Sequence, residues 1–294
     1  MPLFFYIIMD SALQNRVILD KILVRTSRLG GFIMDDNYEG FKKDVFMLTK
    51  IDLNAYKERQ MKRRIDTLIS KTGVKTYKEY VEILKKDREK YEEFVNYLTI
   101  NVSEFYRNPD QWKILEQTVL PELFEKFGKP LKIWSAACST GDEPYSLVML
   151  LAKFMPLDKI EVIATDIDKQ VLAKAKAGMY SDKSLKGLPK EFVDRYFEKV
   201  NEHTYAISEK IKERVKFQQH NLLKDEYPSR CDLIVCRNVM IYFTEEAKEE
   251  IYKKFHAALK KGAYLFVGST EQMVQPKNLG FTSVHSFFYK TNEN

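Results

Sequence analysis

Residues 131–146 read LKIWSAACSTGDEPYS, and this stretch decides the fold class. Its first six residues are mostly apolar and predict a short strand, and Pro144 predicts the first turn of a helix. Between them lies a run of small residues around Gly141, which lets a ligand approach the backbone at a helix start. Because a single glycine departs from the three-glycine dinucleotide fingerprint, this loop alone is equally consistent with an ordinary tight turn.

The same alternation of strands and helices continues to the end of the chain. Strands are predicted at Leu131–Ala136, Ile160–Thr165, Val215–Gln219, Cys231–Cys236 and Ala263–Gly268. Helices are predicted at Pro144–Phe154, Asp168–Ala177 and Glu245–Leu259. This order indicates an α/β fold with a mostly parallel sheet and helices on both faces.

Two segments depart from this alternation. The interval at about 180–213 is longer than a simple crossover and contains a strand-like run at 203–207, so we expect a small inserted β-subdomain. Residues 280–289 predict an antiparallel pair that closes the edge of the sheet.

The first third of the chain is helical in pattern. Met61, Ile65 and Leu68 fall on one side of a predicted helix, and charged residues fall on the other. Helical spacing breaks within 99–103, and Asn108-Pro109 predicts a cap and first-turn proline of a new helix. We therefore expect a helical domain at 36–108 and an α/β domain at 109–294, after an extension at 1–35 that has no assigned role.

Composition excludes several functional classes. The 294 residues are 45% hydrophobic and carry a net charge of +6, which is too small and too dispersed to require a nucleic-acid partner. The longest apolar run, residues 3–9, is far shorter than a membrane span and lacks the flanks of a secretory signal, so a cytoplasmic protein is expected. The three cysteines and four histidines form no metal-ligand, disulfide or nucleophile pattern, and no metal is expected.

Polar residues follow four of the predicted strands. In an open parallel sheet, ligands bind beyond the carboxyl ends of the strands. The first end is the small-residue loop, and the second carries Asp166, a carboxylate placed to hold ribose hydroxyls or simply to cap a helix. The third carries Asn221, suited to an adenine edge or to a turn. The fourth, residues 236–243, crowds Arg237, Asn238 and Tyr242 at the end of a buried strand. Together these ends favour a nucleoside site over four unrelated turns.

Four ordered motifs carry a family resemblance. They are LTINVSEFYR at 98–107, ACSTGDEPYS at 137–146, ATDI at 164–167 and CRNVMIYF at 236–243. On these motifs the chain resembles the CheR family of chemotaxis receptor methyltransferases from about Tyr38 to its end. Ser103 stands where threonine is common, which keeps the hydroxyl, and Asp142 stands where glutamate is frequent. Residues 1–35 lie outside the resemblance.

The resemblance implies a helical domain followed by a class I S-adenosylmethionine-binding domain with a β-subdomain insert. The cofactor contacts carried over by motif position are Asn101, Ser103, Arg107, Glu143, Asp166, Asn221, Leu222, Arg237 and Asn238. Tyr242 would face a receptor glutamate, which receives the methyl group and leaves S-adenosylhomocysteine as the product. The implied protein acts as a cytoplasmic monomer recruited to membrane receptors, without inserting into the membrane.

This chemistry suits the residues. A glutamate with a pKa of about 4.3 is already ionised near neutral pH and needs no base before it attacks a methyl group. Tyr242 and Arg107 are the predicted catalytic residues, with a positioning role. Residues 57–75 contain seven basic and two acidic residues. Taken alone they read as a solvated face, but the resemblance implies that Arg59, Lys62 and Arg63 dock on the receptor's helical bundle.

Two other functions remain open from the sequence. Residues 238–242 loosely resemble the Asn-Pro-Pro-Tyr motif of nucleic-acid amino-group methylases, but both prolines and an aromatic stacking patch are missing. A module that binds S-adenosylmethionine without turnover is the second alternative. Intact Arg107 and Tyr242 argue against it.

Overall fold

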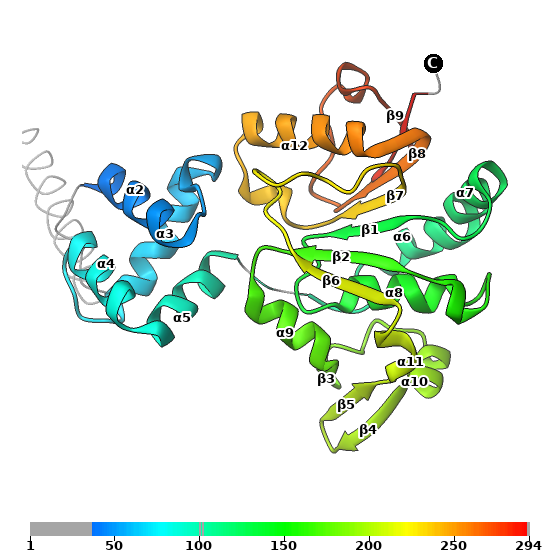
Figure 1. Cartoon of the computed structure of the whole chain (residues 1–294), viewed down its shortest axis with the longest axis horizontal. Coiled ribbons are helices and arrows are strands. Elements are labelled where there is room, and N and C mark those ends of the chain that lie inside the picture. Colours follow the sequence, from blue (N-terminus) through cyan, green and yellow to red (C-terminus); the bar gives the residue numbers. More distant parts are fainter. Residues whose placement is uncertain (1–36, 100, 102, 293–294) are drawn as a thin grey trace, which may run out of the picture. The chain divides into compact units, whose positions relative to one another are not determined.

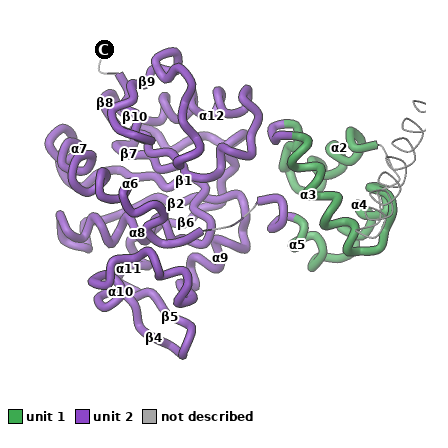
Figure 2. Tube along the Cα trace, turned by 180° about the vertical axis from the view of Figure 1, so that it is seen from behind, with its two compact units in different colours: residues 1–54, 58–94 green, residues 55–57, 95–294 purple. Residues whose placement is uncertain are grey.

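The computed structural model describes residues 37–99, 101 and 103–292, and these form helices and two β-sheets (Figure 1). The extension predicted at 1–35 lies outside the described residues. The chain divides into two compact units (Figure 2), one containing residues 37–54 and 58–94 and the other containing 55–57 and 95–292. The division predicted near residue 108 therefore differs from the end of the first unit at Phe94, because Val95 and the described residues after it belong to the α/β unit.

The first unit is helical. Its helices are α2 (Tyr38–Thr49), α3 (Glu58–Ser70), α4 (Tyr77–Lys86) and the first part of α5 (Arg88–Thr99). Thr76 and Glu79 form a reciprocal capping box that starts α4. The core is aromatic, with the rings of Phe41 and Tyr77 stacked at 4.7 Å and Phe94 fully buried.

The second unit is built on a seven-stranded sheet in the order β6-β2-β1-β7-β8-β10-β9. The strands are β1 (Ile133–Ala136), β2 (Val162–Asp166), β6 (Val215–Gln219), β7 (Cys231–Cys236), β8 (Leu259–Val267), β9 (Phe281–His285) and β10 (Phe288–Thr291). β6, β2, β1, β7 and β8 pair in parallel, while β10 and β9 are antiparallel and form the edge. The predicted α/β class with a mostly parallel sheet and an antiparallel edge is confirmed.

Successive residues of the central strands enter two different cores, as the pleat of a strand requires. Ile133 and Leu233 face the core formed with α6 (Pro109–Ile114), α7 (Leu120–Phe127) and α8 (Asp142–Leu151). Trp134 and Ile234 face the core formed with α12 (Glu245–Ala258). Because both faces are covered, the central strands are buried throughout and read as apolar runs in the sequence.

A second, three-stranded antiparallel sheet interrupts the α/β unit. Its strands, in the order β3-β5-β4, are β3 (Met179–Ser181), β5 (Thr204–Ile207) and β4 (Phe197–Asn201). Together with α10 (Lys190–Tyr196) and α11 (Glu209–Lys212), this sheet forms a small subdomain that follows α9 (Lys169–Ala177) in the chain. The Tyr180 hydroxyl donates to the carbonyl oxygen of Thr140 at 2.7 Å, so this subdomain supports the loop after β1.

Candidate functional site

The candidate site is a pocket at the carboxyl ends of the parallel strands, where an open α/β sheet places its ligands. It brings together ten residues predicted from the sequence to form one site. They are Asn101, Ser103, Arg107, Glu143, Asp166, Asn221, Leu222, Arg237, Asn238 and Tyr242. Asn101, Ser103 and Arg107 come from the segment before α6, Glu143 lies in the first turn of α8, and Asp166 is the last residue of β2. The other residues follow β6 and β7.

The loop after β1 is shaped by residues in the left-handed region. Ala137, Ser139 and Gly141 have φ angles of 62°, 49° and 89°. A Cβ on Gly141 would lie 2.9 Å from Cβ of Ala175, so a side chain at this position would push α9 away. The turn exposes backbone to the pocket just before α8 begins at Asp142, as the small residues of this loop predict.

Asp166 ends β2 and holds this turn. The backbone N–H of Ser139 donates to its Oδ2 at 2.8 Å, and the backbone N–H of Asp168 donates to its Oδ1 at 3.0 Å. The residue is 6% exposed, and burial raises the pKa of Asp166 to about 6. A carboxylate offers about four acceptor sites, so Asp166 can hold the turn and still accept from a ribose hydroxyl.

Asn101 is oriented by its neighbours. Its Nδ2 donates to Oδ2 of Asp168 at 2.9 Å and to Oγ1 of Thr99 at 2.8 Å. Asp168 also caps α9 by accepting from the N–H of Gln170. The helix-capping role weighed for Asp166 is therefore filled by Asp168.

The segment after β6 forms a turn at the pocket. Oδ1 of Asn221 accepts from the N–H of Leu223 at 2.9 Å, which is the turn geometry weighed against an adenine contact. Leu222 is 7% exposed, and its carbonyl oxygen accepts from the Tyr227 hydroxyl at 2.7 Å. Leu222 and Leu223 give this wall of the pocket an apolar surface suited to a flat base.

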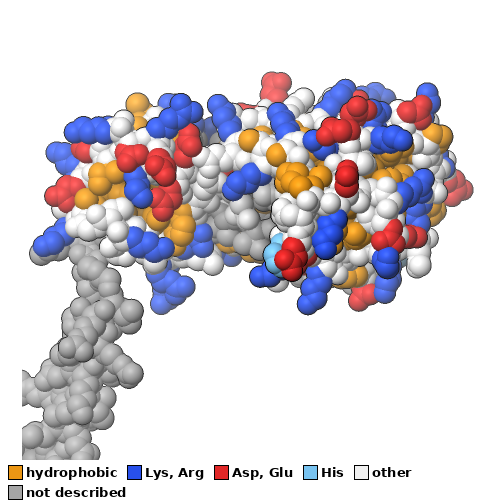
Figure 3. Space-filling model, turned by 90° about the horizontal axis from the view of Figure 1, so that it is seen from below, with side chains coloured by type: hydrophobic (Ala, Val, Ile, Leu, Met, Phe, Trp, Pro, Cys, Tyr) orange, Lys and Arg blue, Asp and Glu red, His pale blue; other side chains and the backbone are white. Residues whose placement is uncertain are grey.

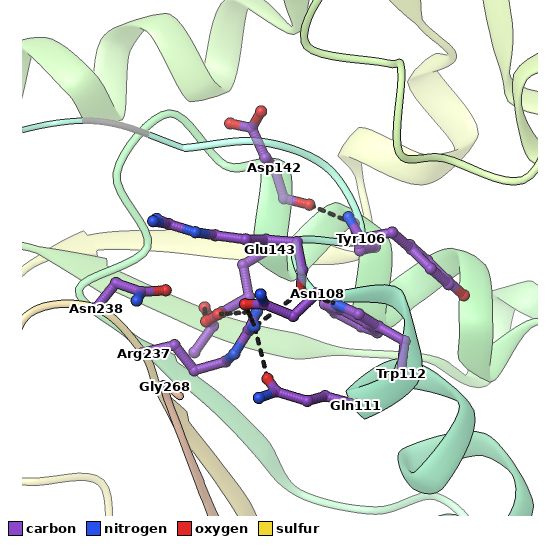
Figure 4. A network of polar contacts seen from close by, with 12 residues as sticks. Tyr106, Asn108, Gln111, Trp112, Asp142, Glu143, Arg237, Asn238 and Gly268 are labelled. Atoms are coloured by element: carbon purple, nitrogen blue, oxygen red, sulfur yellow. Dashed lines mark hydrogen bonds and ion pairs between the residues drawn. The ribbon is translucent and has the colours of Figure 1, made fainter. Parts of the chain in front are cut away.

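Arg237 is a buried anchor for the segment before α6 (Figure 4). Its Nη2 donates to the carbonyl oxygen of Arg107 at 2.7 Å, to Oδ1 of Asn108 at 3.0 Å and to Oε1 of Gln111 at 2.9 Å. Asn108 is the N-cap residue of α6, as predicted, but its side chain makes no cap hydrogen bond and instead accepts from Arg237. α6 nevertheless begins at Pro109.

Glu143 lies beside this network. Its Oε1 accepts from the Ser135 hydroxyl at 2.8 Å, and its Oε2 lies 3.7 Å from Nη1 of Arg237. Burial raises the pKa of Glu143, while the guanidinium of Arg237 opposes that shift. A carboxylate with one distant cationic partner is suited to accept a further cationic group, such as an amino group, from a ligand.

The loop after β7 carries Asn238 and Tyr242 and has two partners that sequence reasoning missed. Glu271 accepts hydrogen bonds from the backbone N–H groups of Asn238 and Met240, both at 2.6 Å. Tyr56 forms an isolated antiparallel bridge with Phe243, and their rings lie 5.0 Å apart. Tyr56 also lines the pocket. Neither residue sits in a local pattern that marks a site, although Glu271 does follow the end of a strand.

Cys138 and His220 line the pocket as well, which the sequence did not predict. Cys138 is 2% exposed, and burial raises the pKa of its thiol well above the ordinary value, which keeps it neutral. Nε2 of His220 lies 3.1 Å from the carbonyl oxygen of Glu226, and its ring packs edge-on against Trp134. Both side chains are part of the packed wall of the pocket.

The three predicted docking residues lie on α3 in the helical unit. Arg59 and Arg63 are exposed. Lys62 differs, because its Nζ lies 3.1 Å from Oδ2 of Asp66 and 5.5 Å from the centre of the Tyr77 ring. On the face shown in Figure 3, basic and acidic side chains are interspersed.

Neither a membrane-spanning helix nor a metal-binding cluster is present among the described residues. No described helix combines the length and apolarity needed to cross a bilayer. Within the same residues, no three histidine, cysteine or acidic side chains come together in a way that could bind a metal ion.

Comparisons with known proteins identify the two units. Residues 36–99 match the family model described as "CheR methyltransferase, all-alpha domain", and residues 101–288 match "CheR methyltransferase, SAM binding domain". The chain is 40% identical to a chemotaxis protein methyltransferase of Listeria monocytogenes over 87% of this chain and 97% of the relative. It is 35% identical to chemotaxis protein methyltransferase 1 of Pseudomonas aeruginosa over 81% of this chain and 90% of that protein. The corresponding protein of Borreliella burgdorferi is 32% identical, with 85% and 92% covered.

Proposed function

Because the chain belongs to the CheR methyltransferase family, we propose that it transfers the methyl group of S-adenosylmethionine to glutamate side chains of bacterial chemotaxis receptors. The family supports S-adenosylmethionine-dependent methylation in chemotaxis. The observation that carries the finer proposal is that Tyr242 and the buried carboxylate of Asp166 line one pocket at the strand ends. In it, a methyl donor and a receptor carboxylate can meet.

The residues of the pocket fit this cofactor. Asp166 accepts from the ribose, Leu222 and the Asn221 turn face the adenine, and Glu143 accepts from the amino group. Asn101, Ser103, Arg107, Arg237 and Asn238 complete the proposed contacts. Arg237 mainly positions other residues of the site, because its guanidinium donates to the carbonyl oxygen of Arg107 and to the side chains of Asn108 and Gln111.

When bound, S-adenosylmethionine supplies an electrophilic methyl group. The receptor glutamate is ionised near neutral pH, so the protein needs no general base and must align the carboxylate with the methyl group. The Tyr242 hydroxyl donates to that carboxylate, and Arg107 neutralises a carboxylate at the pocket mouth. Neither contact should be strong, because tight binding of the ground-state charge does not raise the rate. No metal takes part in this proposal.

Docking occurs through α3. Arg59 and Arg63 face solvent and provide positive charge for the glutamate-rich helical bundle of a receptor. Lys62 contributes less than the sequence implied, because it already pairs with Asp66. We place the protein in the cytoplasm as a monomer that is recruited to receptors in the membrane and does not insert into the bilayer.

Methyl transfer to purified receptor cytoplasmic fragments tests the proposed function. With radiolabelled S-adenosylmethionine, the fragments should gain label that base releases as methanol, because glutamyl esters are hydrolysed in base. Fragments whose methylation-site glutamates are replaced by alanine should gain none. Base-stable label, or transfer to nucleic acid, would favour the methylase alternative. Tight cofactor binding without any transfer would favour the sensing module.

Charge reversal on α3 tests the docking proposal. R59E/R63E should lower kcat/KM for receptor fragments by about tenfold at low salt, because steering by complementary charge acts on association. The defect should shrink as salt screens the charges, while cofactor affinity stays unchanged. K71E/K75E is the matched control, since it makes the same charge change outside α3. Equal defects in both variants would assign the effect to net charge alone.

A further inference from the structure

Glu271 lies in the turn after β8, and its side chain reaches the loop after β7. It is 3% exposed, and it is not among the residues that line the site pocket in the described chain. Its carboxylate accepts from the backbone N–H groups of Gly268 at 2.8 Å and of Asn238 and Met240 at 2.6 Å. Two of these three donors belong to the loop that carries Tyr242.

The local sequence fits this arrangement. A Cβ on Gly268 would lie 2.3 Å from Oε2 of Glu271 and 2.9 Å from the backbone nitrogen of Asn238. Any other residue at 268 would therefore displace the carboxylate from the loop. Asn238 has a φ of 62°, in the left-handed region that asparagine tolerates better than most residues. Hydrogen bonds to an ionised acceptor are stronger than neutral ones and can hold such a conformation.

Glu271 is itself fixed to the scaffold. The hydroxyl of Tyr252, on α12, donates to the carbonyl oxygen of Glu271 at 3.1 Å. Burial raises the pKa of the Glu271 carboxyl, and the backbone donors of Asn238, Gly268 and Met240 oppose that shift. The loop after β7 is thereby linked to the turn after β8 through the Glu271 carboxylate, and to α12 through the Glu271 carbonyl oxygen.

We propose that Glu271 is a positioning residue for methyl transfer, which holds the Asn238–Met240 backbone so that the Tyr242 hydroxyl faces the receptor carboxylate. The inference rests on the proposed function and role of Tyr242. Glu271 contacts neither the receptor glutamate nor the cofactor. A displacement of about 1 Å in an aligned site can cost about 100-fold in rate, so the loop's position matters even though Glu271 is outside the pocket.

A double-mutant cycle tests the proposal. Glu271→Gln keeps the shape but replaces one acceptor oxygen by a donor that faces the backbone N–H groups. In the folded variant, kcat for receptor methylation should fall about tenfold or more, while S-adenosylhomocysteine affinity changes by less than about fivefold, because most proposed contacts lie on other loops. Adding Tyr242→Phe should then cost less than about threefold, since its hydroxyl is already misplaced. A parent-like rate, or effects of the two substitutions that multiply, would overturn the proposal.

Asp232→Asn is the matched control. Asp232 is a buried carboxylate at the other end of β7, where it accepts from the N–H of Lys132 at 2.7 Å and pairs with Lys260. This variant should lose thermal stability without the selective loss of kcat.

Amide exchange in the parent protein gives a readout that needs no folded variant and no substrate. The Asn238 and Met240 amides should exchange far more slowly than amides of exposed loops that make no hydrogen bond. Equally fast exchange would show that Glu271 does not hold the Asn238 and Met240 amides, and it would overturn the proposal. A parent that exchanges as expected but methylates no receptor would count against the proposed function instead.

Discussion

The loop after β1 and the loop after β7 are both held by a buried carboxylate, but the two carboxylates stand differently toward the pocket. Asp166 accepts from the N–H of Ser139 and also lines the pocket. Glu271 accepts from the N–H groups of Asn238 and Met240 and lies behind its loop. Both loops contain left-handed residues, so both need an internal acceptor to stabilise an uncommon backbone conformation.

This difference separates two kinds of contribution to a site. A carboxylate in the pocket wall can bind ligand and shape backbone at once, so its loss should affect cofactor binding directly. A carboxylate behind the wall acts through the groups it positions, so its loss should affect alignment more than affinity. Substitution of Asp166 tests the first kind of contribution. Substitution of Tyr242, on the loop that Glu271 holds, tests the second.

The largest effect is expected at Asp166. Asp166→Ala removes the ribose acceptor and the acceptor for Ser139, and hydrogen bonds to a charged group contribute about 1.5–3 kcal/mol. Affinity should fall about 10- to 150-fold, by similar factors for S-adenosylmethionine, S-adenosylhomocysteine and methylthioadenosine, because all three contain the ribose. Calorimetry on the folded variant measures this. Unchanged affinity for all three ligands would remove Asp166 from the site.

Tyr242→Phe should show the opposite pattern. The ring stays and the pocket remains filled, so cofactor affinity should be nearly unchanged. The methylation rate should decrease by a factor of about 5 to 100. One net hydrogen bond contributes about 1 kcal/mol, and the loss of alignment adds to its effect. Stopped-time assays of radiolabel transfer measure the rate.

The pH profile of the Phe variant sharpens this prediction. Since no proton is removed before attack, the residual activity should follow the parent's profile. A limb near the ordinary tyrosine pKa of about 10 that disappears in the variant would identify Tyr242 as a titrating catalytic group. The orienting role would then be wrong.

The strand ends were predictable because the relevant signals are local. β6 and β7 have the predicted bounds. β7 is buried throughout and reads as an apolar run, so the polar residues just after it stand out, whereas β6 is buried only at Val215. Parallel strands place their carboxyl ends at one edge, so the joint placement of Asp166, Asn221 and Arg237 follows from topology.

The partners of these loops were not predictable in the same way. Tyr56 contacts Phe243, and Asn108 contacts Arg237, although each pair is separated by more than 100 residues in the sequence. Such contacts depend on how distant segments pack, and no periodicity in either segment records them. Asn108 shows the consequence, because its local signal marks the helix start while its side chain serves a distant arginine. The end of the helical unit at Phe94 differs from the predicted boundary for a similar reason, since the residues that follow have helical and linker character in the sequence but belong to the α/β unit.

The smallest effect is expected from pH, and it again separates the two carboxylates. Burial raises the pKa of Asp166 to about 6, and hydrogen bonds from ribose hydroxyls favour the ionised form. Above this pKa the carboxylate is ready to bind, whereas below it a proton must leave on binding. Affinity should therefore be constant at neutral pH and fall as pH drops through about 6, approaching tenfold per pH unit.

Glu143 also has a raised pKa, so methylthioadenosine, which lacks the amino and carboxyl groups, is the proper probe. Asp166→Asn should bind it more weakly and lose this slope, whereas Glu271→Gln should keep it. If the pH dependence of affinity persists in Asp166→Asn, another group titrates. Asp166 would then only hold the loop after β1.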